Sequence, residues 1–230
     1  MESIDYHKDK VKPGRETRLF NEWRMIDAEY ALDEAYGHLH ESGNTISAQR
    51  KTHGHPSFGG ICNAVGGITY RITKRNPSGL PLAYEITFRI KSITGVKEPD
   101  RQGLQKPVFG DNHILRITIP NNYPSADGGY PDFKFVTDIW HPNIRFFGEF
   151  KGHVCLNFNS SGTSTSLAEF IGKVAAYLRY DEYHALDVEP FPEDPTVAKW
   201  VREQAEPQGW VNQLKIENES NKLQFRQDEG

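Results

Sequence analysis

Hydrophobic and polar residues recur along this chain with two different periods, and the changes of period outline its elements. From residue 15 the large apolar side chains return every three or four positions, which predicts an amphipathic helix that begins at Arg15 and fades near Gly37. Three later segments alternate residue by residue, as strands with one buried face do. These segments are residues 68–73, 84–90 and 115–119.

The connections between these strands predict antiparallel pairing. Residues 76–79 supply turn residues between the first two strands, and a polar loop is expected over 97–111. Pro120 ends the third strand because it withholds a backbone donor. A fourth strand follows in residues 132–139, where two phenylalanines share one face. We therefore expect a four-stranded antiparallel meander with one buried face and one solvated face.

The period becomes helical again beyond residue 165. Ser166 and Glu169 have the spacing of a capping box and open a broad apolar stripe that reaches Leu178, which predicts a buried helix over the sheet. Asp194 followed by Pro195 predicts the N-cap and first residue of a further helix. One helix, a run of strands and then more helices make an α+β protein.

Breaks in the periodic pattern divide the chain into parts. Residues 1–14 are polar and lysine-bearing and end in a Pro-Gly breaker, so we expect a flexible basic arm. All the periodic segments fall within residues 15–205, the predicted domain, in which 41–66 form a loop insertion. Residues 206–230 are a C-terminal extension, of which only the first half is expected to be tied down.

Composition excludes several classes of protein. The 230 residues carry a formal net charge of -4, so no global basic field draws the chain to nucleic acid. No apolar run approaches the roughly 20 residues that span a bilayer, and the N-terminus lacks the apolar segment of a secretory signal. We expect a cytoplasmic protein that binds neither nucleic acid nor membrane. Its two cysteines, Cys62 and Cys155, are expected to be thiols.

Histidines in pairs give only a weak metal signal. His53 with His55, and His38 with His40, lack the cysteine or carboxylate spacing of a zinc site. We therefore expect neither a metal ion nor a cofactor.

Cys155 is the candidate reactive residue. It follows the fourth strand and precedes the buried helix, so we expect it in an irregular segment over the sheet, where reacting groups often lie on a rigid scaffold. An isolated cysteine is most often a small buried hydrophobe. Whether Cys155 is reactive must therefore be judged from the motifs around it. Four motifs occur in order around it: Pro-Asn-Asn-Tyr-Pro at 120–124, a strand ending in His-Pro-Asn at 141–143, Cys-Leu at 155–156, and Glu-Pro-Phe-Pro-Glu-Asp-Pro at 189–195.

These motifs, in this order and on these elements, resemble the core of the ubiquitin-conjugating enzyme (UBC) family over residues 15–205. The resemblance implies a UBC-like fold. It also implies that Cys155 accepts a ubiquitin-like protein from an activating enzyme as a thioester and passes it to a lysine amine or another acceptor, with or without a ligase. A thioester suits this role because a thiolate both attacks well and leaves well.

The resemblance implies roles for the neighbours of Cys155. Asn143 matches the amide that stabilises the oxyanion or orders the loop of the site. Glu189 matches an acidic residue that positions the incoming amine, while Asp194 is assigned to the helix cap. Structural roles fall to His141, which organises its turn by hydrogen bonding, and to Pro142 and Tyr123.

Two features concern partners and lineage. The family docks its activating enzyme on the first helix, and the matching basic residues are Lys12, Arg15 and Arg18. By themselves the charges of this helix favour a solvated face, so their docking role rests on the resemblance. Residues 145–151 enlarge the connection between the turn and the cysteine, and Ser and Gly replace the family's tryptophan after it. With these departures the chain resembles the divergent conjugating-enzyme-like proteins that bacterial operons encode. Those operons are similar to antiviral ubiquitination-like systems.

Two other functions compete with this interpretation. A non-catalytic UBC variant that serves as an interaction module would usually have lost the cysteine that this chain retains. A cysteine hydrolase would pair Cys155 with His141 or His153. Such enzymes commonly hold the cysteine at a helix start, where the helix dipole lowers its pKa, whereas here a Ser- and Gly-rich segment separates Cys155 from the next helix.

Overall fold

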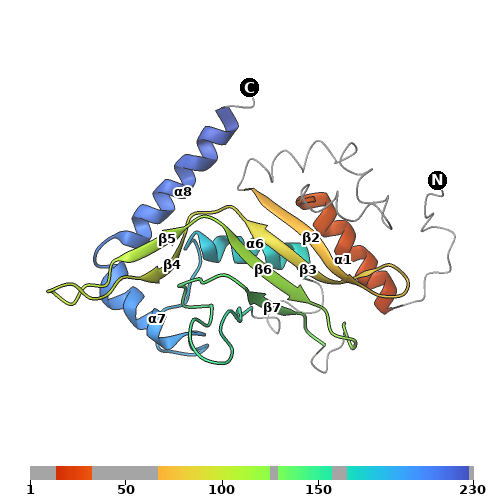
Figure 1. The fold of residues 1–230 in the computed structure, drawn as a ribbon, viewed down its shortest axis with the longest axis horizontal. Coiled ribbons are helices and arrows are strands. Elements are labelled where there is room, and N and C mark those ends of the chain that lie inside the picture. The colour runs from red at the N-terminus through yellow and green to blue at the C-terminus, as the bar shows by residue number, and fades with distance from the viewer. Residues whose placement is uncertain (1–13, 33–66, 125–128, 157–164, 228–230) are drawn as a thin grey trace.

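The computed structural model describes residues 14–32, 67–124, 129–156 and 165–227 (Figure 1). The basic arm with Lys12, the loop insertion with Cys62, and the paired histidines lie outside the described residues.

An antiparallel sheet forms the centre of the α+β fold. Its strands are β2 (Ile68–Arg75), β3 (Pro81–Phe88), β6 (His113–Thr118) and β7 (Asp132–Phe135). Each is antiparallel to the next in that order, which confirms the predicted four-stranded antiparallel meander. Along β6, Leu115 and Ile117 are fully buried whereas Arg116 and Thr118 are exposed, as the alternating pattern predicted. The last strand is shorter than the expected 132–139.

The first helix is shorter than predicted. Helix α1 (Arg15–Glu29) ends where Tyr30 takes an extended conformation, and the chain continues as β1 (Ala31–Leu32), which pairs in parallel with β2. Tyr30 is still buried, and its hydroxyl donates to the carbonyl of Ala168 over 2.9 Å. The apolar period therefore identified the buried positions correctly, but pairing with the sheet edge ended the helix.

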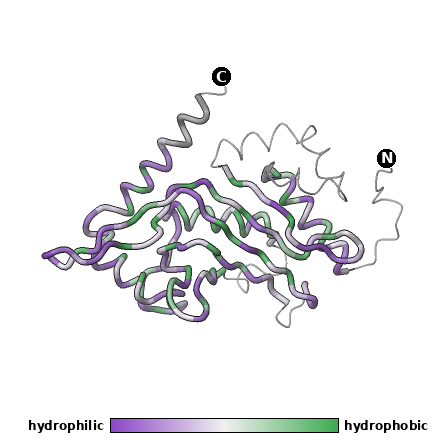
Figure 2. The backbone as a smooth tube through the Cα atoms, viewed as in Figure 1, coloured by the Kyte–Doolittle hydropathy of each residue, from purple (hydrophilic) through white to green (hydrophobic). Residues whose placement is uncertain are grey.

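The prediction of a polar loop over 97–111 was wrong for its second half. Strands β4 (Ser92–Val96) and β5 (Pro107–Gly110) form a separate antiparallel ribbon between β3 and β6. Val108 and Phe109 in β5 are both about two-fifths exposed, at 39% and 41%, so β5 lacks the buried face that makes a strand visible in a sequence. Figure 2 shows the tip of this ribbon as hydrophilic.

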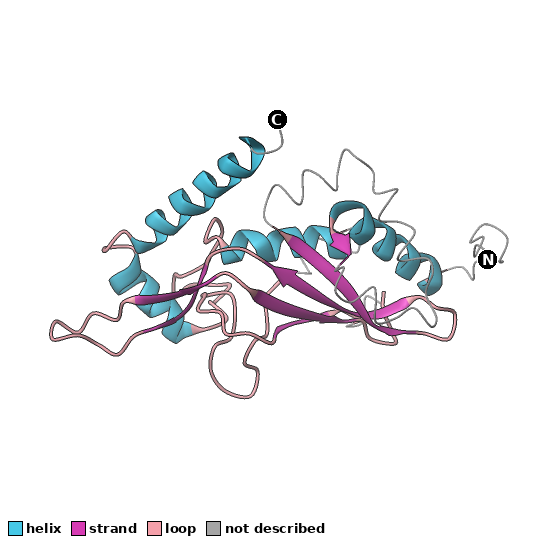
Figure 3. Cartoon of the chain, turned by 45° about the horizontal axis from the view of Figure 1, so that its top comes forward, coloured by secondary structure: helices cyan, strands magenta, loops and turns pink. Residues whose placement is uncertain are grey.

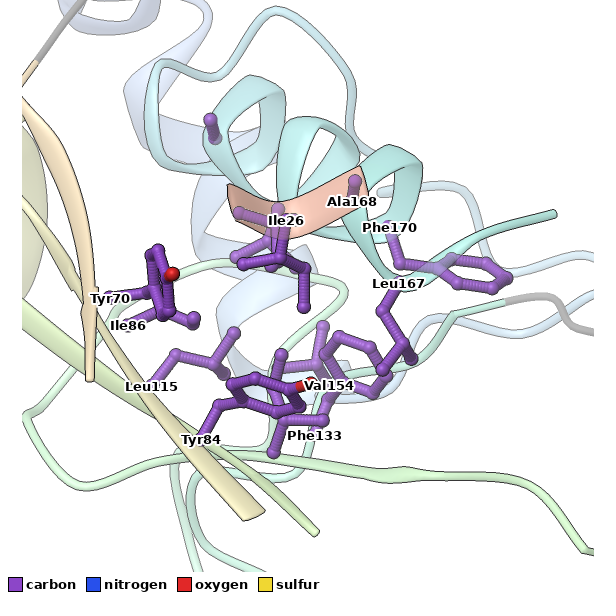
Figure 4. Packing of buried hydrophobic residues seen from close by; sticks show 14 of the residues in the cluster. Ile26, Tyr70, Tyr84, Ile86, Leu115, Phe133, Val154, Leu167, Ala168 and Phe170 are labelled. Atoms are coloured by element: carbon purple, nitrogen blue, oxygen red, sulfur yellow. The ribbon is translucent and has the colours of Figure 1, made fainter. Parts of the chain in front are cut away.

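Helix α6 (Leu167–Leu178) begins with the predicted capping box: the Ser166 hydroxyl accepts from Glu169 N–H, and the Glu169 carboxylate accepts from Ser166 N–H over 2.6 Å. Its apolar stripe packs with α1 on one face of the sheet (Figure 3). The main core between helices and strands includes Ile26, Ile86 and Leu115, which converge in Figure 4. The predicted buried helix over the sheet is thus confirmed.

A second hydrophobic cluster lies beyond the end of the sheet. It brings together α7 (Pro195–Trp200), the π-helical segment η4 (Val201–Ala205), and the start of α8 (Trp210–Gln227) around Trp140 and Ile93. Val211 and Leu214 of α8 are buried here, whereas Ile216 is 67% exposed and the helix then extends away from the sheet (Figure 1). Within the described residues, no helix is both long and apolar enough to cross a membrane.

Candidate active site

The His-Pro-Asn turn and Cys155 lie side by side. The Cys155 N–H donates to the Asn143 carbonyl over 2.9 Å, and an antiparallel bridge joins Ile144 to Val154. A further bridge joins His153 to Lys134 of β7. The cysteine segment is therefore held between the sheet edge and the turn, as the expected position over the sheet requires.

His141 orders the turn from a fully buried position. Its Nδ1 accepts the Asn143 N–H over 3.1 Å, so Nε2 carries the proton and donates to the Glu182 carbonyl over 3.2 Å. Burial lowers the pKa of His141 to about 3, and the ring stacks on Tyr177 with centroids 5.1 Å apart. A neutral ring with both nitrogens occupied holds the backbone in place and is not positioned to move a proton.

The Asn143 side chain ties the turn to the loop before α7. Its Oδ1 accepts the backbone N–H of His184 over 2.9 Å. This bond fixes the orientation of the amide, because Nδ2 then remains as the donor side. The contact is of the loop-ordering kind, and it leaves Nδ2 as the donor group of the amide.

Cys155 sits in an extended segment with alternating burial. Gly152, Val154 and Leu156 are buried, whereas His153 and Cys155 are partly exposed, so the imidazole and the thiol share the outer side of the segment. Figure 4 shows Val154 pointing into the core beside Phe133. Burial, and then the negative charge of Glu193, raise the pKa of the Cys155 thiol, while Lys173 acts in the opposite direction.

Glu193 is the carboxylate whose charge acts on the Cys155 thiol among the described interactions. Glu189 is exposed, and none of the described interactions joins it to Cys155. Glu193 Oε1 lies 3.3 Å from Arg145 Nε and 3.4 Å from His153 Nδ1. Burial would raise the pKa of Glu193, but hydrogen bonds and charge from His153 and Arg145 outweigh it and hold that pKa below its ordinary value.

Asp194 is the predicted helix cap and also connects the loop before α7 to two neighbouring segments. Its Oδ1 accepts from Thr196 N–H and Val197 N–H, each over 3.1 Å, which confirms the N-cap. Its Oδ2 accepts from Phe146 N–H over 2.8 Å, and its own N–H donates to the Pro142 carbonyl over 3.0 Å. The buried carboxylate of Asp194 thus joins α7 to the enlarged connection, and the backbone N–H of the same residue joins both to the His-Pro-Asn turn.

The enlarged connection, residues 145–151, is a closed loop. Arg145 N–H donates to the His153 carbonyl over 2.9 Å, and Gly152 N–H donates to the Arg145 carbonyl over 2.7 Å. Gly152 has φ 89°, and a Cβ there would lie 2.2 Å from the Phe135 carbonyl oxygen, so only glycine fits. Phe146 packs on Trp140 with ring centroids 4.7 Å apart.

Tyr123 lies against α1. Its hydroxyl donates to the buried carboxylate of Glu22 over 2.7 Å and accepts from Arg18 Nε over 3.0 Å. Glu22 also accepts the Leu167 N–H at the start of α6 over 2.6 Å. Among the described contacts, Tyr123 therefore supports the packing of α1 and α6, not the Cys155 segment.

The expected partner-binding arginines make internal contacts. Arg18 forms an ion pair with Glu22 at 2.6 Å and donates to the Thr165 carbonyl over 3.0 Å. Arg15 donates to the Pro120 carbonyl over 3.2 Å. The exposed face of α1 instead presents Arg24 and Met25.

Sequence reasoning missed the contribution of Glu193 and Arg145 to the site. The i, i+2 spacing of His153 and Cys155 in an extended segment was a usable signal for the histidine. No local pattern could indicate which of several acidic loop residues folds back on it. Within the described ranges, no cluster of His, Cys, Asp and Glu is arranged to hold a metal ion.

Comparisons with known proteins add no assignment: no protein-family model matches the chain, and no curated protein sequence matches it significantly.

Proposed function

We propose that the protein is a conjugating-enzyme-like acyltransferase with a UBC-like fold, which carries a ubiquitin-like protein as a thioester on Cys155 and transfers it to an amine. The observation that supports this most is the hydrogen bond from Cys155 N–H to the Asn143 carbonyl, which unites two of the four motifs at one place. Asn143 Nδ2 is the donor available for the oxyanion, and the buried neutral His141 keeps the turn in shape.

The electrostatics of Cys155 favour a carrier over a cysteine hydrolase. Hydrolases need a thiolate at neutral pH, and so they lower the pKa of the nucleophile. Here burial and the charge of Glu193 raise that pKa. No described hydrogen bond joins the Cys155 thiol to His141 or His153. A protonated thiol of this kind reacts poorly by itself and depends on a partner that delivers an activated acyl group.

The partners follow from the proposed reaction. An activating enzyme supplies the acyl group, and a lysine-bearing protein, with or without a ligase, receives it in the cytoplasm. For the activating enzyme we propose docking on α1, where the exposed face offers Arg24 and Met25. The alternative is a non-catalytic interaction module with the same architecture, in which Cys155 carries no acyl group.

A chemical probe tests the proposal without an identified partner. A peptide ending in Gly-Gly, supplied as its 2-mercaptoethanesulfonate thioester, is incubated with the full chain, and intact-protein mass spectrometry follows the adduct. We expect an adduct on Cys155 that thiol reducing agents remove. Cys155→Ala should abolish this adduct, whereas Cys62→Ala, the matched control, should retain it. An adduct of equal rate and yield in Cys155→Ala would contradict the proposal and favour the interaction module.

A further inference from the structure

The outer side of the cysteine segment carries two functional groups. Val154, between His153 and Cys155, points into the core (Figure 4). In an extended segment its two neighbours therefore face outward, and both are partly exposed. The His153 side chain is 44% exposed, so an incoming molecule can reach its ring. This spacing comes from the backbone, which bridges to β7 at His153 and to the turn at Val154.

Glu193 lies next to both of these side chains. Its Oε1 is 3.4 Å from His153 Nδ1, and its charge acts on the Cys155 thiol. Arg145 Nε, 3.3 Å away, holds the same oxygen. Hydrogen bonds between catalytic groups are often long before substrate binds, and a distance of 3.4 Å has that character.

We propose that His153, oriented by Glu193, is the general base that takes the proton from the attacking amine when the acyl group leaves Cys155. This inference rests on the proposed function and extends it. A proton on Nδ1 directed at Glu193 makes Nε2 the basic nitrogen, which is the tautomer that a carboxylate partner selects. His153 is thus the catalytic residue, and Glu193 and Arg145 are positioning residues.

The neutral amine nitrogen attacks the thioester carbonyl carbon, a C–N bond forms, and the C–S bond to Cys155 breaks. The surplus proton on nitrogen passes to His153 Nε2. The imidazolium then returns that proton to the departing Cys155 thiolate, so the products are an amide and a thiol. The raised pKa of the Cys155 thiol makes it a ready acceptor for this proton.

The charges around His153 set the pH range in which it acts. The hydrogen bond and charge of Glu193, with a further contribution from Asp132 on β7, raise the pKa of His153 against the effect of burial and of Arg145. Only the neutral ring is a base, so the contribution of His153 should appear as pH rises through a value above its ordinary pKa of about 6.5.

The test uses the full chain charged with the same Gly-Gly peptide and freed of excess reagent. Discharge to free lysine is measured from pH 5.5 to 8.5 for wild type and His153→Gln. The ratio of the two rates cancels the ionisation of lysine, which is common to both. We expect a ratio near one at the acidic end, a rise through the pKa of His153, and a plateau of about a hundredfold. Charging itself should change by less than about twofold, because it involves no amine.

Three further variants test which carboxylate sets the pH at which His153 acts. Glu193→Gln removes the charge but keeps an acceptor, so the rise should move to lower pH. Glu98→Gln, an exposed carboxylate at the tip of the β4–β5 ribbon, should leave the profile unchanged. A shift of the rise to lower pH in Glu189→Gln, with no shift in Glu193→Gln, would overturn the assignment of Glu193. A ratio that is flat with pH would overturn the base role while leaving the carrier function intact, whereas failure of Cys155 to charge would remove both.

Discussion

Asp194 offers the sharpest test of how the site is braced. Its carboxylate is 2% exposed and serves two elements at once: Oδ1 caps α7, and Oδ2 accepts the Phe146 N–H of the enlarged connection. Loss of an aspartate N-cap costs about 1 kcal/mol. A partly buried N–H that loses its partner costs about 1 kcal/mol more, the lower end of the usual range. Asp194→Ala should therefore lower the free energy of unfolding by about 2 kcal/mol.

Asp194→Asn separates these two contributions. An asparagine caps about as well as an aspartate, but it has one acceptor oxygen and so cannot also receive the Phe146 N–H. Its expected cost is about 1 kcal/mol. Urea unfolding measures the free energy of unfolding of both variants. The slope of that free energy against urea concentration should be the same as in the wild type. Asp187→Ala, an exposed carboxylate in the same loop, should change stability by less than about 0.5 kcal/mol. A cost below about 1 kcal/mol for Asp194→Ala would refute the bracing role.

Two further predictions concern the turn. The pKa of His141 is lowered to about 3 in the folded chain, against about 6.5 when unfolded, so its stabilising contribution is present above pH 6.5 and is lost as pH falls toward 3. Between pH 7.5 and 5 the wild type should lose about 2 kcal/mol more stability than His141→Gln in urea unfolding, and equal losses would contradict this. Asn143→Ala should charge normally with the Gly-Gly probe but discharge to lysine about a hundredfold to a thousandfold more slowly. Equal loss of both steps would indicate a folding role.

Local patterns were reliable wherever neighbours in sequence are also neighbours in space. The capping box of Ser166 and Glu169 and the cap at Asp194 each depend on contacts within four residues, and both formed as predicted. The antiparallel pairing of β2 with β3 followed from their alternation and the turn between them. In these cases the hydrogen-bonding partners are set by the chain itself.

Contacts between segments distant in sequence decided the features that the local patterns predicted wrongly or did not reveal. The period of α1 continued past Glu29, but pairing of Ala31–Leu32 with β2 ended the helix. Strand β5 was not recognisable, because Val108 and Phe109 stay partly exposed and leave no alternating burial. Glu193, rather than Glu189, meets His153 because the loop before α7 folds back on the enlarged connection.

The sequence by itself determined the α+β plan, the buried faces of its main elements, the helix caps, and Cys155 and the His-Pro-Asn turn as the candidate centre. Periodicity and capping encode the plan, the buried faces and the caps, since both act over a few residues. The candidate centre came instead from the order of four motifs and from the family that they resemble. Only the tertiary structure decided that Glu193 is the carboxylate that meets His153, that His141 is buried while His153 is partly exposed, and that Arg18 binds the buried Glu22. Burial and charge at a site depend on segments brought together from distant parts of the chain, and no local pattern records them.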